Sequence, residues 1–178
     1  ITNQRPLSYS FGKGELTQSC VIFQNSYILH CILGLTISAC FLSLTSLLFE
    51  DRFLNIDASQ TTEARYVYYI VITTVLLTFI SSPFRALLTA RENIVYISII
   101  DILDGMLKLA LTFILFYITE YRLTCYAIIL SAVMFFNFLA LSIFCKIRYK
   151  EAALLPHPLQ CSKKVQRQLI GFATWTLY

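Results

Sequence analysis

Residues 123–145 read LTCYAIILSAVMFFNFLALSIFC, 23 consecutive residues without a charged side chain. An α-helix rises about 1.5 Å per residue, so about 20 apolar residues cross the roughly 30 Å hydrocarbon core of a bilayer. A helix on the surface of a soluble domain would instead carry a polar face along its whole length. This stretch therefore predicts a transmembrane helix, and it sets the scale for reading the rest of the chain.

Three other segments have a similar length and composition. Residues 16–49 and 66–84 contain no charged side chain, and residues 94–119 are apolar apart from two aspartates and one lysine. The chain as a whole is 57% hydrophobic and 13% charged, whereas soluble domains have about 45–50% apolar and about 25% charged residues. Strands of a membrane barrel would be about ten residues long and alternate in polarity. We therefore expect an all-α, polytopic membrane protein with spans at residues 24–49, 66–84, 94–119 and 123–146 and a partial span at 168–178.

The basic residues predict which connections face the cytoplasm. Ten of the 14 lysines and arginines lie in alternate connections or directly beside them, and three lie in the other connections. Loops rich in lysine and arginine stay on the cytoplasmic side of a membrane. The net charge of +4 reflects this bias, and no basic stripe with interleaved aromatic residues predicts nucleic-acid binding. We expect inner loops at residues 1–20, 85–92 and 147–167 and outer loops at residues 50–65 and 120–122.

The two ends of the sequence predict an internal part of a longer membrane protein. The chain begins with Ile1 and carries no signal peptide. Residues 169–178 open a further apolar segment that stops after about half a span. We therefore expect helices both before and after this sequence.

Pro83 lies near the inner end of the second predicted span, directly after two serines. Proline lacks a backbone N–H and disfavours the helical conformation of the residue before it. We expect the helix to kink or to end there, before the inner loop. A hinge in a moving helix is the alternative interpretation.

The polar residues of segment 94–119 fall on one side of the predicted helix. At about 100° per residue, Asp101, Asp104, Lys108 and Thr112 lie within a stripe that is about 100° wide. Each charge near the middle of a span costs about 2.5–3.5 kcal/mol, whereas a leucine or isoleucine returns only about 0.3–0.6 kcal/mol. This face must therefore meet protein or water instead of lipid.

Two interpretations of the stripe remain open. Asp104 and Lys108 are four residues apart with the acid first, so they can form an ion pair that locks the rotation of the helix. Together with Asp101 and Thr112 they can instead line a transport cavity, in which the lysine attracts an anionic headgroup and a carboxylate takes a proton or a cation. Secondary candidates for such a cavity are polar or basic residues in or beside the other spans, namely His30, Arg85, Arg91 and Asn137.

The sequence predicts neither an enzyme nor a cofactor or metal site. The motifs GxSxG and HExxH and the phosphate-binding P-loop are absent. The six cysteines show no CxxC and no spacing typical of zinc ligands. No catalytic or metal-binding residues are therefore assigned, and the polar stripe is the main candidate site.

The order of four short motifs resembles that of bacterial polysaccharide flippases. Residues 10–15 (SFGKGE) resemble the inner loop between their second and third helices, and residues 83–92 (PFRALLTARE) resemble the proline-containing loop after the fourth. Residues 102–109 (ILDGMLKL) are similar to the fifth helix, and residues 171–176 (GFATWT) are similar to the start of the seventh. The chain thus resembles the O-antigen and polysaccharide flippase (Wzx-type) family, which is related to the multidrug and toxin extrusion (MATE) transporters.

This resemblance implies a fold, a location and a function. The four complete spans would be the third to sixth helices, followed by the start of the seventh, of a two-lobed MATE-like transporter with alternating access. The substrate would be an undecaprenyl-pyrophosphate-linked oligosaccharide, flipped across the bacterial inner membrane for surface polysaccharide and lipopolysaccharide synthesis. A coupling ion, H⁺ or Na⁺, is left open. The alternatives are a cation-coupled multidrug antiporter of the same fold and a non-transporting membrane scaffold or enzyme subunit.

Overall fold

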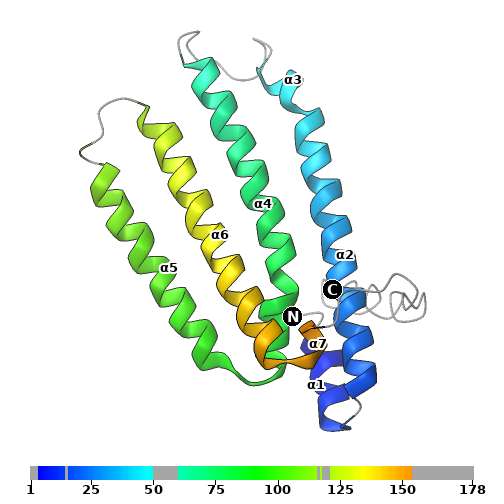
Figure 1. The fold of residues 1–178 in the computed structure, drawn as a ribbon. Coiled ribbons are helices and arrows are strands. Elements are labelled where there is room, and N and C mark those ends of the chain that lie inside the picture. Colours follow the sequence, from blue (N-terminus) through cyan, green and yellow to red (C-terminus); the bar gives the residue numbers. More distant parts are fainter. Residues whose placement is uncertain (1–3, 15, 50–59, 116, 118–120, 154–178) are drawn as a thin grey trace.

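All elements in the described part of the chain are α-helices, as the sequence predicts. The computed structural model describes residues 4–14, 16–49, 60–115, 117 and 121–153. Four long helices lie side by side in the order α5, α6, α4 and α2 (Figure 1). The elements are α1 (Gln4–Gly12), α2 (Leu16–Ser43), α3 (Thr45–Phe49), α4 (Thr61–Ala90), α5 (Ile94–Leu115), α6 (Arg122–Arg148) and α7 (Lys150–Ala153).

Three of the described helices are long and apolar enough to cross a membrane. They are α4, α6 and the combined α2–α3 segment, Leu16–Phe49. Helix α5 has 22 residues, which is also enough for a span of about 30 Å. It differs from the other three because Asp101, Asp104 and Lys108 lie in its middle part, whereas the charged residues of α4 and α6 lie toward their ends.

Helices that follow one another along the chain run in opposite directions, whereas the neighbours α4 and α6 run parallel. The described parts of the expected inner connections therefore meet at one end of the molecule. Helix α1, the turn between α4 and α5, and helix α7 lie at this end, which we call the inner end (Figure 1). The start of α4, the end of α5 and the start of α6 lie at the opposite, outer end. The described parts of the basic connections predicted from the sequence therefore share one side of the fold.

The inner loop expected at residues 85–92 is helical as far as Ala90. Helix α4 continues through Pro83 to Ala90, and the turn to α5 is short, with Glu92 in the left-handed region at φ 57°. Leu87 and Leu88 are fully buried in the core at the inner end. The burial of these side chains outweighs the local preference of proline against a helix.

Other expected boundaries differ or cannot be compared. The inner loop expected at 1–20 contains α1 and the start of α2, because Leu7 and Ser10 are buried and Ser10 Oγ hydrogen-bonds Ser19 Oγ at 2.8 Å. Helix α5 is described as far as Leu115. Parts of the expected segments lie outside the described residues, namely 1–3, 15, 50–59, 116, 118–120 and 154–178, which include the whole partial span 168–178.

Helices α2 and α4 approach closely at Gly34. A Cβ atom added to this glycine would lie 2.9 Å from the Cβ of Phe79 and 3.2 Å from a methyl group of Leu76. Small residues at helix contacts allow this approach, and packing of this kind drives helix association in membranes. Gly34 therefore fixes the separation of the two helices.

Polar contacts hold α4 to the α6–α7 segment at both ends. At the outer end, one carboxylate oxygen of Glu63 accepts hydrogen bonds from the backbone N–H and the hydroxyl of Thr124, both at 3.1 Å. At the inner end, Arg91 forms an ion pair with Glu151, whose side chain is only 1% exposed. The Arg91 guanidinium also lies 3.8 Å from the centre of the Phe11 ring. These contacts make α4 and α6 one unit, against which α5 lies.

Candidate functional site

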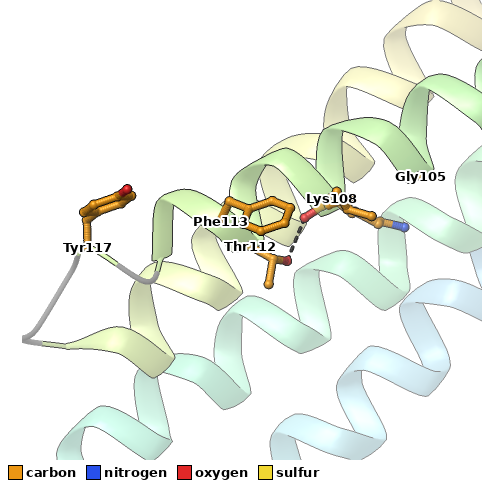
Figure 2. Close-up of a pocket in the computed structure, with 6 residues that line it drawn as sticks. Gly105, Lys108, Thr112, Phe113 and Tyr117 are labelled. Atoms are coloured by element: carbon orange, nitrogen blue, oxygen red, sulfur yellow. Dashed lines mark hydrogen bonds between the residues drawn. The ribbon is translucent and has the colours of Figure 1, made fainter.

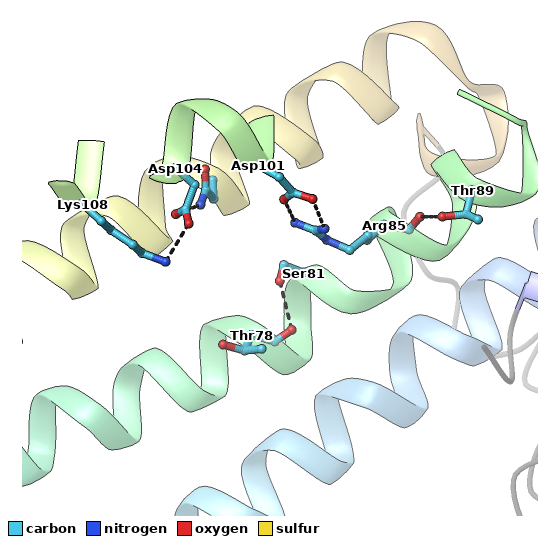
Figure 3. Close-up of polar contacts among 8 residues, drawn as sticks. Thr78, Ser81, Arg85, Thr89, Asp101, Asp104 and Lys108 are labelled. Atoms are coloured by element: carbon cyan, nitrogen blue, oxygen red, sulfur yellow. Dashed lines mark hydrogen bonds and ion pairs between the residues drawn. The ribbon is translucent and has the colours of Figure 1, made fainter. Parts of the chain in front are cut away.

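The predicted pairing of Asp104 with Lys108 is present on α5. Lys108 Nζ lies 2.6 Å from Asp104 Oδ2, in the expected i,i+4 arrangement (Figure 3). The lysine side chain is 44% exposed and the aspartate side chain is 19% exposed. The pair therefore lies at the edge of the packed helices, with the ammonium group on the more open side.

Asn137 of α6 provides the second hydrogen-bond partner of the Asp104 carboxylate. Its side-chain amide nitrogen donates to Asp104 Oδ1 at 2.5 Å, so the two carboxylate oxygens have different partners. Asn137 itself is 8% exposed. The sequence predicted Asn137 as a secondary candidate, and the structure brings it into the main group.

Arg85 of α4 pairs with Asp101 of α5 through two parallel contacts. The guanidinium nitrogens lie 2.7 and 3.0 Å from the two carboxylate oxygens, and both side chains are about half exposed (Figure 3). Such two-point contacts fix geometry as well as charge. The sequence analysis did not predict this pair. The sequence did contain an indication of this pair. Arg85 and Asp101 lie at similar distances from the tight turn between α4 and α5, and such residues lie at similar depth in antiparallel helices.

The two ion pairs belong to one network. Asp104 lies within electrostatic range of Arg85, and Lys108 lies within electrostatic range of Asp101. The network contains two cations and two carboxylates, so its formal charge is zero.

A hollow of about 770 Å³ lies on α5 beside Lys108. Its wall consists of one glycine, one lysine, one threonine and three large apolar or aromatic residues, namely Gly105, Lys108, Thr112, Leu109, Phe113 and Tyr117 (Figure 2). The Thr112 hydroxyl donates to the backbone oxygen of Lys108 at 2.7 Å, so it is satisfied within its own helix. A Cβ atom added to Gly105 would meet open space. The hollow thus presents one cation among aromatic and aliphatic surfaces.

His30 and Arg91 lie away from this network. A ring nitrogen of His30 is 2.8 Å from the backbone oxygen of Ser26, one turn earlier on α2. Arg91 is engaged with Glu151 at the inner end. Glu151 was missed by the sequence analysis, although it is the one acid within the basic connection 147–167. We therefore assign a structural role to His30 and to Arg91.

The described residues hold no cluster of histidine, cysteine, aspartate or glutamate that could bind a metal ion. The chain matches no family model, no curated protein and no solved structure. The function must therefore be argued from the network on α5 and from the order of the sequence motifs.

Proposed function

We propose that the protein is a transporter that flips undecaprenyl-pyrophosphate-linked oligosaccharide across the bacterial inner membrane for surface polysaccharide synthesis. The observation that carries this proposal is a half-exposed network of ion pairs inside a helix of spanning length. A charged face of this kind cannot lie against lipid. The described helices leave Asp101 and Lys108 about half exposed, so further protein, water or a polar substrate must meet them.

The chemistry of the hollow suits an anionic headgroup that carries apolar or ring-shaped parts. A lysine ammonium has three hydrogens, and Lys108 uses one on Asp104. Among the described residues the other two have no acceptor, and Lys108 is one of the residues that line the hollow. The exposed rings of Phe113 and Tyr117 offer flat surfaces in the same hollow that Lys108 lines. A phosphate group would accept hydrogen bonds from the Lys108 ammonium, and sugar rings would pack against the aromatic side chains.

For the fold we propose the third to sixth helices of a two-lobed MATE-like transporter. The order and spacing of the four motifs support this placement. The proposal also agrees with a polar face on α5 that its neighbours do not cover, because a second lobe would enclose that face as a cavity. A coupling ion, H⁺ or Na⁺, would bind to the carboxylates of Asp101 or Asp104.

Complementation tests this function directly. The gene that encodes the chain is expressed in a bacterial strain that lacks its own flippase, and surface polysaccharide is measured at matched protein levels in the membrane. We expect export with the native protein and a loss of about tenfold or more with Lys108→Gln, since this change removes one charge-assisted contact. The matched control is Lys146→Gln, at the inner end of α6, which should retain export.

The two carboxylates on the same face favour a second candidate, a cation-coupled multidrug antiporter. In this case the native protein would not restore polysaccharide but would raise resistance to cationic drugs, and Asp104→Asn would abolish that resistance. A scaffold without transport activity would give neither phenotype. Normal membrane insertion without polysaccharide export would therefore contradict the flippase proposal.

A further inference from the structure

Asn137 contacts the charge network from a different helix than the one that carries it. Its amide nitrogen reaches Asp104 Oδ1, and the other oxygen of the same carboxylate holds Lys108. Asn137 is 8% exposed and lies among the buried residues of α6. Its side chain thus links the packed interior of the helix group to the half-exposed lysine.

An aspartate that bonds only to a lysine four residues away can rotate together with it, because both side chains have several rotamers. A second hydrogen bond from a buried amide fixes the plane of the carboxylate. The ammonium then occupies a defined position, and Lys108 lines the hollow together with Gly105 and Thr112. A site that binds an anion gains from this ordering, since the lysine need not be immobilised when the ligand arrives.

Helix docking does not depend on this contact. On the inner half of α5, the Tyr96 hydroxyl donates to the backbone oxygen of Ala140 at 3.2 Å, and the Tyr96 ring stacks on Phe144 with 3.7 Å between the ring centres. The Arg85–Asp101 pair fixes the same helix to α4. These contacts hold α5 in place without Asn137. The hydrogen bond from Asn137 can therefore serve to orient the charged pair.

We infer that Asn137 is a positioning residue: it orients Asp104 and thereby presents the Lys108 ammonium to a phosphate-bearing headgroup in the hollow. This inference rests on the proposed function, because it requires that an anionic lipid binds there. Asn137 itself touches no substrate. Its effect is on the affinity for the charged headgroup and not on the affinity for the polyprenyl chain.

Two lipids that differ only in the headgroup test this role. Purified protein is titrated with undecaprenyl pyrophosphate and, separately, with undecaprenol, and binding is measured by native mass spectrometry. We expect Asn137→Leu to weaken undecaprenyl pyrophosphate binding about tenfold, the scale of one hydrogen bond to a charged group, and to leave undecaprenol binding unchanged. Lys108→Gln should show the same selectivity. The control is Ser142→Ala, which removes another buried polar group of α6 and should bind both lipids like the native protein.

The possible failures are distinguishable. Equal loss of both lipids in Asn137→Leu would mean a general structural role and would overturn the inference. Full affinity for undecaprenyl pyrophosphate in Asn137→Leu, with a loss in Lys108→Gln, would also overturn it while the proposed function stands. A native protein that binds the two lipids equally would overturn the headgroup site and the inference together.

Discussion

Asp104 uses one carboxylate oxygen for Lys108 and the other for Asn137, so its removal leaves two polar partners without an acceptor. We predict that Asp104→Ala lowers the free energy of unfolding by about 1–3 kcal/mol, the range for a buried polar group that loses its hydrogen bond. The double variant Asp104→Ala with Lys108→Ala should regain part of this loss, because the lone ammonium is gone. Thermal unfolding in detergent measures both. Equal losses in the two variants would contradict the ion pair.

The residues of this network show what the sequence could and could not predict. The helical period alone placed Asp101, Asp104 and Lys108 on one face, because spacing within one helix fixes relative direction. The partners Arg85 and Asn137 come from α4 and α6, 16 and 33 residues away from the acids that they bind. Such contacts depend on which helices pack together, and the periodicity of a single helix carries no information about that choice.

At the scale of elements, Gly34 sets the distance between α2 and α4. We predict that Gly34→Ala destabilises the protein by about 1–3 kcal/mol, the usual cost of overpacking, because the new Cβ atom would lie 2.9 Å from that of Phe79. Gly105→Ala is the matched control, since its Cβ atom meets no atom within 4 Å. This variant should unfold at or slightly above the native temperature, because alanine favours the helix. Similar unfolding temperatures for the two variants would contradict the close approach.

The inner end depends on a buried charge. Glu151 is 1% exposed and pairs with Arg91, so Arg91→Gln leaves a carboxylate buried without its cation. We predict a loss of roughly 3–5 kcal/mol, the range for breaking a buried ion pair from one side. The double variant Arg91→Gln with Glu151→Gln should recover part of the loss. Chemical unfolding followed by circular dichroism measures the stability of both variants. An unchanged midpoint in Arg91→Gln would show that the pair adds no stability.

The helix boundaries illustrate a different limit of sequence analysis. Length and hydropathy predicted where apolar segments lie, and the all-α class followed from them. The loop expected at residues 85–92 is helical to Ala90 because Leu87 and Leu88 are buried against neighbouring helices. A local signal such as Pro83 could not show this, since the deciding contacts come from residues distant in the sequence.

On the scale of the whole molecule, the arrangement predicts which ends face which side of the membrane. In a background without native cysteines, Tyr117→Cys at the outer end should react with a membrane-impermeant maleimide in intact spheroplasts. Glu92→Cys, in the turn at the inner end, should react only after permeabilisation. The basic inner connections supply the physical reason, because they remain in the cytoplasm. The reverse pattern would invert the topology, and equal labelling of both sites in intact cells would contradict the membrane placement.

In the proposed flippase, Lys108 of the half-exposed network on α5 contacts the headgroup of the lipid-linked oligosaccharide. The most direct measurement is the rate at which a fluorescent undecaprenyl-pyrophosphate-linked disaccharide crosses the bilayer of proteoliposomes that contain the purified protein. We predict rapid flipping with the native protein and with Lys146→Gln, and a rate lower by about tenfold or more with Lys108→Gln, the effect of one lost charge-assisted contact. A native rate equal to that of protein-free liposomes, or an unchanged rate in Lys108→Gln, would contradict this proposal.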